Sequence, residues 1–212
     1  MLKRLALLAA LAAVLASPAA LAGQTPLPLT GSVADFSRID PPLPAPGDAF
    51  RDSAGRSLHL ADFRGKVVLL NIWATWCGPC QSEMGSLDRL QATLGGADFT
   101  VLPLSIDHGG GPAVALFYAE RELTHLGVYL DSRSAIADRM GVDGVPTTFV
   151  IDRNGRLVGK LEGATDWDTP EALALLRGYI AKQPQPSAPA VQIVPTAFQR
   201  PAQQVGTGLS PL

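Results

Sequence analysis

The sequence predicts an α/β fold, in which helices flank both faces of a mixed central β-sheet and a β-hairpin is added at the N-terminal side. A nearly continuous apolar run at residues 66–73 is typical of a strand that is buried on both faces. After it, helical and strand patterns alternate, and the pattern finishes with a hairpin followed by a helix. We therefore expect one folded domain that spans residues 45–182.

Turn and capping residues separate the expected elements. Strands are expected, in chain order, at residues 50–52, 57–60, 66–73, 99–106, 128–130, 147–151 and 156–161. Helices are expected at residues 79–94, 112–123 and 134–140, and from residue 170 onward.

In the first half of the domain, Ser53-Ala54-Gly55 separates the two strands of the hairpin. The first helix begins at Pro79 and ends before Gly95-Gly96, because glycine is favoured just past the C-terminus of a helix. Pro103 interrupts the strand at 99–106. Since proline cannot donate to a β-ladder, we expect an edge or a bulge there.

In the second half, Pro112 opens a helix, and a short strand and a short helix follow it. Asn154-Gly155 is a strong turn signal for a hairpin between the last two strands. Thr169 is expected to cap the last helix, with Pro170 in its first turn and Glu171 placed favourably for the helix dipole. These signals complete the pattern of a mixed sheet covered by helices.

The segments outside the domain carry signals of their own. Residues 1–22 are predicted to be a signal peptide, because Lys3 and Arg4 precede a short apolar run with small residues at its end. This predicts a periplasmic protein; an uncleaved membrane anchor is the alternative, although the apolar run is short for a span. Residues 23–44 are expected to form a Pro/Gly-rich linker, and residues 183–212 a disordered Pro/Gln-rich tail.

Charge and cysteine content exclude several classes of function. The formal net charge is −2 and the chain has no run of Lys and Arg, so we expect no nucleic-acid partner. Two cysteines, Cys77 and Cys80, are too few for a disulfide framework, and the three histidines are scattered in sequence rather than spaced as zinc ligands. In an exported protein, such a pair indicates redox chemistry.

The cysteine pair lies where the buried strand ends and a helix begins. The N-terminus of a helix stabilises a thiolate, so Cys77 is expected to be the exposed thiol of low pKa that attacks a substrate disulfide. Cys80, one turn further along, is expected to resolve the mixed disulfide that results. Pro79 is tolerated in the first helical turn and stiffens it.

Three nearby positions leave alternatives open. Glu83 follows Cys80 by three residues on nearly the same helical face, so it either accepts the Cys80 proton or is an ordinary surface carboxylate. Asn71 in the buried strand is either a polar partner of the site or a satisfied core amide, which we slightly favour. Val145-Pro146 precedes a strand. A cis bond there would leave the Val145 backbone free to pair with an extended substrate, although trans bonds are commoner.

Two motifs carry a family resemblance: Trp73-Ala74-Thr75-Trp76-Cys77-Gly78-Pro79-Cys80 and Gly144-Val145-Pro146-Thr147-Thr148-Phe149. Together they resemble the thioredoxin superfamily, and more narrowly its TlpA and ResA branch of exported thiol–disulfide oxidoreductases, over residues 45–181. The resemblance implies a thioredoxin-like fold, a cis bond before Pro146 and a catalytic role for Glu83. It also implies substrate contacts at Trp76, Gly78, Pro79, Val145 and Pro146.

The resemblance further implies a dithiol reductant of other exported proteins, with no cofactor beyond the Cys77–Cys80 disulfide and with a membrane thiol conduit as electron donor. TlpA-like proteins act on copper-site maturation proteins and on a cytochrome oxidase subunit, and ResA-like and CcmG-like relatives act on apocytochrome c. Residues 105–110 and 161–167 are most similar to TlpA. Met84-Gly85, where relatives commonly have a proline, and the long tail depart from the family pattern. We expect a monomer.

Two other functions fit parts of the sequence. Cys77, Cys80 and His108 would suit a Cu(I)-carrying module, because soft thiolates bind that ion, although copper chaperones of related fold usually space their cysteines more widely. A thiol peroxidase of the same superfamily would need a single cysteine activated by a nearby Thr and Arg, and the sequence does not show that arrangement.

Overall fold

The computed structural model describes residues 29–182; the predicted signal peptide, the predicted tail and residues 23–28 lie outside this range. Its strands are β1 (Ser37–Pro44), β2 (Ala49–Asp52), β3 (Ser57–His59), β4 (Val67–Trp73), β5 (Phe99–Ser105), β6 (Tyr129–Leu130), β7 (Thr147–Ile151) and β8 (Arg156–Glu162). Its helices are η1 (Gly31–Val33), η2 (Leu60–Phe63), α1 (Gly78–Leu94), α2 (Gly110–Glu120), α3 (Ala135–Arg139) and α4 (Pro170–Ala181). Within 29–182, no helix has the length and apolar character of a membrane span.

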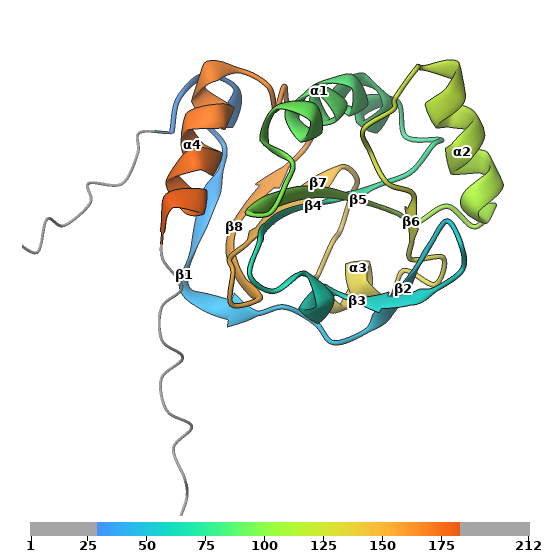
Figure 1. Cartoon of the computed structure of the whole chain (residues 1–212), viewed down its shortest axis with the longest axis horizontal. Helices are drawn as coiled ribbons and strands as arrows, with labels where there is room; N and C mark the ends of the chain where they lie inside the picture. The colour runs from blue at the N-terminus through green and yellow to red at the C-terminus, as the bar shows by residue number, and fades with distance from the viewer. Residues whose placement is uncertain (1–28, 183–212) are drawn as a thin grey trace, which may run out of the picture.

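One mixed sheet organises the domain (Figure 1). Its strand order is β1-β8-β7-β4-β5-β6-β2-β3. The strand β4 lies inside the sheet, parallel to β5 and antiparallel to β7. The predicted hairpin is confirmed as β2 and β3, which extend the sheet at one edge.

The apolar run of β4 explains why both faces of the sheet are covered. All seven of its residues are buried. Because successive side chains of a strand point to opposite faces, Leu69 and Trp73 join the core formed with α1, α2 and α4, whereas Leu70 and Ile72 join the core that includes α3. Figure 1 shows α1 and α4 on one side of the sheet and α3 on the other. The predicted fold class is confirmed.

The signals at Thr169 and Asn154-Gly155 lie where the sequence placed them, whereas α2 begins at Gly110, two residues before Pro112. Thr169 caps α4 by accepting a hydrogen bond from the Ala172 N–H at 3.3 Å, and Pro170 opens the helix. The turn between β7 and β8 contains Asn154 and Gly155, and Gly155 has a φ of 78°, which glycine adopts without strain.

The expected bulge at Pro103 is absent, because the register of β5 with β4 is unbroken, but the expected edge is present locally although β5 as a whole lies inside the sheet. Pro103 is in register with Asn71 of β4. On the other side of β5, the short strand β6 pairs with Leu104 and Ser105 alone. The missing N–H of Pro103 therefore interrupts no pairing with β6.

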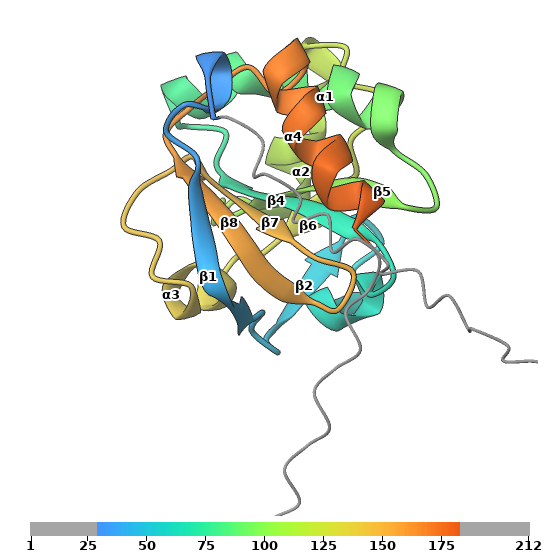
Figure 2. The ribbon, with the colours of Figure 1, turned by 90° about the vertical axis from the view of Figure 1, so that its left-hand side faces the viewer.

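The predicted linker at 23–44 is wrong for the part that the structure describes. That part forms η1 and β1, and β1 pairs with β8 along the edge of the sheet (Figure 2). Ser37 is in register with Lys160 and Pro44 with Arg156, and the register shifts between these ends. An edge strand needs ladder bonds on one side only, so it tolerates the prolines that suggested a spacer. The domain therefore begins before β1.

The residues just before β1 also enter the core. Val33 and Phe36 expose 1% and 2% of their surface. The Phe36 ring lies directly over Gly159 of β8, where an added Cβ would collide with it. Tyr179 of α4 packs against the same ring, with 6.2 Å between the ring centroids. This N-terminal segment is part of the hydrophobic core and not an appendage.

Replacing Phe36 by alanine is expected to lower the free energy of unfolding by about 3–5 kcal/mol, because the change empties a buried aromatic site. Leu43→Ala in β1 is the matched control: Leu43 is 52% exposed, so its loss should stay within about 0.5 kcal/mol. Equilibrium unfolding in urea measures both variants. Equally small effects would mean that the segment is a spacer after all.

Candidate active site

Cys77 and Cys80 form a disulfide at the start of α1. The strand β4 ends at Trp73, and a short turn leads to Cys77, which is the N-cap of α1. The two Cα atoms are 5.2 Å apart, and the N–H of Cys80 donates to the Cys77 Sγ at 3.1 Å. The first cysteine therefore receives one of the N–H groups that a helix leaves unpaired at its N-terminus.

The two cysteines differ in their access to solvent. Cys77 exposes only 6% of its surface in the oxidised protein, less than the exposed thiol that the sequence predicts, whereas Cys80 exposes none. A partner arriving from outside can therefore meet Cys77 first, and Cys80 lies beneath it. This asymmetry is what an attacking and a resolving sulfur require.

Val145 and Pro146 lie against the disulfide. The bond between them is cis, and the Val145 carbonyl oxygen is 3.4 Å from the Cys77 Sγ. Trp76, next to Cys77 in the chain, has 65% of its surface exposed. The residues predicted to contact substrate therefore lie around one sulfur atom: Trp76, Gly78, Pro79, Val145 and Pro146.

Glu83 is buried, with 1% of its surface exposed, so the surface-carboxylate alternative is wrong. Burial raises the pKa of its carboxyl to about 7, although hydrogen bonds from the Thr165 N–H and the Asn71 amide act to lower it. Trp167 lowers this pKa least, and its indole N–H has no hydrogen-bond partner of ordinary geometry within residues 29–182. A carboxyl with this pKa can take up and release a proton near neutral pH.

Asn71 links this carboxyl to the strand that follows Pro146. Its Nδ2 donates to the Glu83 Oε1 at 2.8 Å and to the Thr148 Oγ1 of β7 at 2.9 Å. Its Oδ1 is buried and has no hydrogen-bond partner among residues 29–182. Asn71 is therefore a polar partner of Glu83, and the prediction of a satisfied core amide is wrong.

Sequence reasoning missed the residues that hold the turn before Cys77. The N–H and the hydroxyl of Thr75 donate to the buried Asp107 carboxylate at 2.9 and 2.7 Å. The Gln81 Nε2 donates to the Thr75 carbonyl oxygen at 2.7 Å, and Arg121 donates to the other end of the Gln81 amide. Asp107 lies within residues 105–110, and the resemblance of this segment to TlpA is the signal in the sequence that points to it.

The histidines do not join the cysteines. His108 is exposed, and the His125 Nδ1 lies 2.7 Å from the Asp88 carboxylate. In the part of the chain that the structure describes, no group of three or more His, Cys, Asp or Glu side chains is arranged to hold a metal ion. The set of Cys77, Cys80 and His108 considered for Cu(I) is therefore not assembled.

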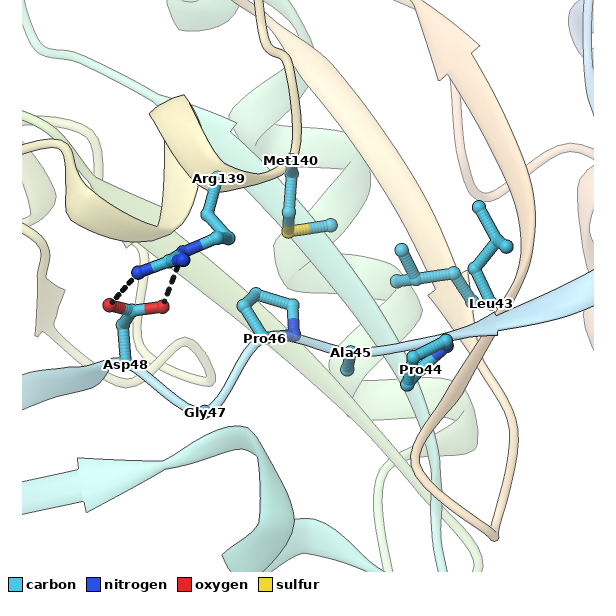
Figure 3. Close-up of a pocket in the computed structure, with 9 residues that line it drawn as sticks. Leu43, Pro44, Ala45, Pro46, Gly47, Asp48, Arg139 and Met140 are labelled. Carbon is cyan, nitrogen blue, oxygen red and sulfur yellow. Dashed lines mark hydrogen bonds and ion pairs between the residues drawn. The ribbon is translucent and has the colours of Figure 1, made fainter.

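A pocket of about 580 Å³ lies between α3 and the segment that joins β1 to β2 (Figure 3). Pro46 and Met140 are among its apolar lining residues. Asp48 and Arg139 also line it and form a bidentate ion pair. The Arg139 Nε and Nη2 each lie 3.2 Å from an oxygen of the Asp48 carboxylate. None of the predicted site residues lines this pocket, so it is not part of the disulfide site.

Comparisons with known proteins agree with this geometry. The Redoxin family model matches residues 36–176. The chain is 32% identical over 152 residues to a thiol-disulfide oxidoreductase ResA of Bacillus cereus, a match that covers 72% of this chain and 83% of the relative. It is 34% identical over 114 residues to ResA of Geobacillus thermodenitrificans, covering 53% of this chain and 64% of that relative's length.

Solved structures give the same picture. A crystal structure of a thiol:disulfide interchange protein DsbE from Chlorobium tepidum has a TM-score of 0.58 at 29% identity, covering 67% of this chain and 99% of that one. The exposed lipoprotein thioredoxin Etrx1 of Streptococcus pneumoniae has a TM-score of 0.53 at 27% identity, covering 62% and 98%. The chain therefore belongs to the Redoxin family, in the ResA-like branch of the thioredoxin superfamily.

Proposed function

We propose that this chain is an exported thiol–disulfide oxidoreductase that reduces disulfides in other exported proteins. The observation that supports this most directly is the Cys77–Cys80 pair at the start of α1, with one sulfur near the surface and the other buried. Relatives that match most of the folded part are named thiol–disulfide oxidoreductases. The chemistry follows from the positions of the two sulfurs and of Glu83.

In the reduced protein, Cys77 is the nucleophile. The positive end of the α1 dipole and the N–H of Cys80 stabilise a thiolate at the N-cap position. This thiolate attacks one sulfur of the substrate disulfide. A new S–S bond joins the two proteins, and the other substrate sulfur leaves as a thiolate.

Cys80 then resolves the mixed disulfide. Its thiol must lose a proton before it can attack the Cys77 sulfur, and Glu83, three residues further along the same helix, is the base. The Cys77–Cys80 bond forms, the second substrate sulfur leaves as a thiolate, and Glu83 holds the proton. Two electrons have then passed from the cysteine pair to the substrate.

The surface around Cys77 suits an extended segment of a protein substrate. Trp76 offers an exposed aromatic face. The cis bond before Pro146 sets the Val145 backbone beside the Cys77 sulfur, where it can pair with the backbone of a bound chain. Gly78 is also exposed, and without a side chain it lets that chain approach closely.

The proposal also covers where the protein acts and which proteins it exchanges electrons with. The predicted signal peptide at 1–22 directs the protein to the periplasm. No soluble NADPH is present on that side of the membrane, so a membrane thiol conduit re-reduces the cysteine pair. The substrates are exported proteins with cysteine pairs that take part in copper-site, cytochrome oxidase or cytochrome c maturation. The protein acts as a monomer and needs no cofactor beyond its own disulfide.

A glutathione redox titration is expected to give a reduction potential close to that of thioredoxin, about −270 mV, because both proteins carry Gly-Pro between the cysteines. Alkylation of free thiols followed by mass spectrometry measures the reduced fraction at each point. A value close to about −120 mV, the potential of DsbA, would make the protein an oxidant instead.

Cys80→Ser is expected to leave substrates covalently bound to Cys77, because no second thiol resolves the mixed disulfide. Periplasmic extracts separated without reductant, followed by mass spectrometry, identify the trapped proteins. Cys77→Ser is the matched control and should trap nothing. Trapped copper-site proteins would indicate a TlpA-like substrate class, and trapped apocytochrome c a ResA-like class. Equal trapping by both variants would contradict the roles of Cys77 as the attacking and Cys80 as the resolving cysteine.

The rate of disulfide reduction is expected to rise with pH as the Glu83 carboxyl, with its pKa of about 7, loses its proton. Below that pH the protonated carboxyl cannot accept the Cys80 proton. Glu83→Gln should remove the inflection and slow the reaction about 100-fold above neutral pH. Stopped-flow fluorescence with a model disulfide measures the rate.

The control for this variant is Glu120→Gln, which neutralises an exposed carboxylate on α2. Its pH profile should match that of the unaltered protein. An inflection near pH 7 that persists in Glu83→Gln would assign the titration to another group.

A further inference from the structure

The loop of residues 163–169, between β8 and α4, lies directly over the Glu83 carboxyl. The N–H of Thr165 in this loop donates to the Glu83 Oε2 at 3.1 Å. The hydroxyl of the same Thr165 points to the other side and donates to the carbonyl oxygen of Ser32 in η1. One residue therefore connects the proton-carrying group to the N-terminal segment, across 133 positions of sequence.

A second contact fastens the same segment to the end of the loop. The Ser32 and Thr169 hydroxyls are 2.6 Å apart and share a hydrogen bond. Thr169 is the N-cap of α4, so the loop cannot move away from η1 without disturbing the start of that helix. Val33 and Phe36, which follow this contact in the chain, are buried in the core.

The inner side of the loop is fixed to α1. The Trp167 N–H of the main chain donates to the Ser86 Oγ at 3.0 Å, and that hydroxyl donates to the Glu83 carbonyl oxygen at 2.7 Å. The Trp167 side chain is fully buried. The loop is thus bonded to α1 beside Glu83 on one side and to Ser32 of η1 on the other.

We propose that residues 29–36 act as a clasp that holds Thr165 over the Glu83 carboxyl and keeps water away from it. Thr165 is then a positioning residue, since it acts on the cysteines only through Glu83. This inference rests on the proposed function for its catalytic meaning, but the clasp itself is a property of the oxidised, resting protein.

The raised pKa of the Glu83 carboxyl agrees with a site from which water is excluded. Burial is the largest cause of its raised pKa, and the opposing causes are hydrogen bonds rather than charges. The ionisable groups on the elements packed there are Cys80, Asp88 and Arg89 on α1, Asp166 and Asp168 on the loop, Asp35 in residues 29–36 and Glu171 in the first turn of α4. Asp35 is exposed, and the Glu171 side chain lies beside Gly31. Arg89 pairs with Asp168, Asp88 binds the His125 segment, Cys80 is in the disulfide, and Asp166 is exposed.

Thr165→Val keeps the shape of the side chain and the main-chain N–H but removes the hydroxyl. The Ser32 carbonyl oxygen would then lose its donor, and an unpaired polar group is costly unless water reaches it. Because the bond from the Trp167 N–H to Ser86 still holds the loop on α1, the Thr165 N–H stays on Glu83. Water that enters between Thr165 and Ser32 then reaches the Glu83 carboxyl as well and stabilises its charged form. The pKa of Glu83 should therefore fall from about 7 towards the usual value for glutamate, by about one pH unit.

The test is a ¹³C NMR titration of the glutamate carboxyl groups in the oxidised full-length chain, with the Glu83 signal assigned by its absence in Glu83→Gln. Thr165→Ser restores the hydroxyl and should restore the midpoint. Thr100→Val is the matched control, because Thr100 is also half-buried with its hydroxyl on a carbonyl oxygen, that of Val101, near the far end of β5. Its Glu83 midpoint should not move.

A Glu83 midpoint that stays in place or rises in Thr165→Val would overturn the clasp. So would a midpoint near the usual value for glutamate in the unaltered protein, because water would already reach the carboxyl. Neither result touches the redox function, which the trapping and potential measurements test separately. Conversely, a Glu83→Gln protein that reduces disulfides at full rate would show that Glu83, and with it the clasp, has no role in catalysis. The shift of the Glu83 midpoint in Thr165→Val would still stand.

Discussion

The pairing of β4 with β5 and β7 is the constraint on which the rest of the structure depends. Every residue of β4 is buried, so its backbone groups have no water to bind and must pair with strands on both sides. Its apolar side chains then require cover on both faces of the sheet. The end of this rigid strand delivers the turn with Cys77 to the start of α1, and the neighbouring β7 delivers Pro146 to the same place.

The polar groups enclosed in this apolar framework belong to the site. Glu83, Asn71 and Thr148 form one chain of hydrogen bonds from α1 through β4 to β7. Burying a carboxyl there disfavours its charged form, so the same packing that stabilises the fold also sets the proton affinity of the group beside the cysteines. The fold and the proton chemistry thus share one cause, the exclusion of water around β4.

The N-terminal segment shows how the ResA-like core of this chain is completed. Phe36 fills the space over Gly159, β1 covers the open edge of β8, and η1 binds the loop that carries Thr165. A strand rich in proline performs this task because it lies at an edge, where one side needs no ladder. Residues 29–36, which follow the predicted export signal, are therefore also bonded to the loop that covers the Glu83 carboxyl.

The sequence by itself determined the features that depend on neighbouring residues. These include the buried run of β4, the cap at Thr169, the turn at Asn154-Gly155 and the placement of Cys77 and Cys80 at a helix start. Only the tertiary structure decided whether prolines at 41–44 form a spacer or an edge strand, and whether Glu83 faces water or the core. The physical reason is that pairing and burial arise from contacts between residues far apart in the chain, such as Thr165 with Ser32, which no local pattern records.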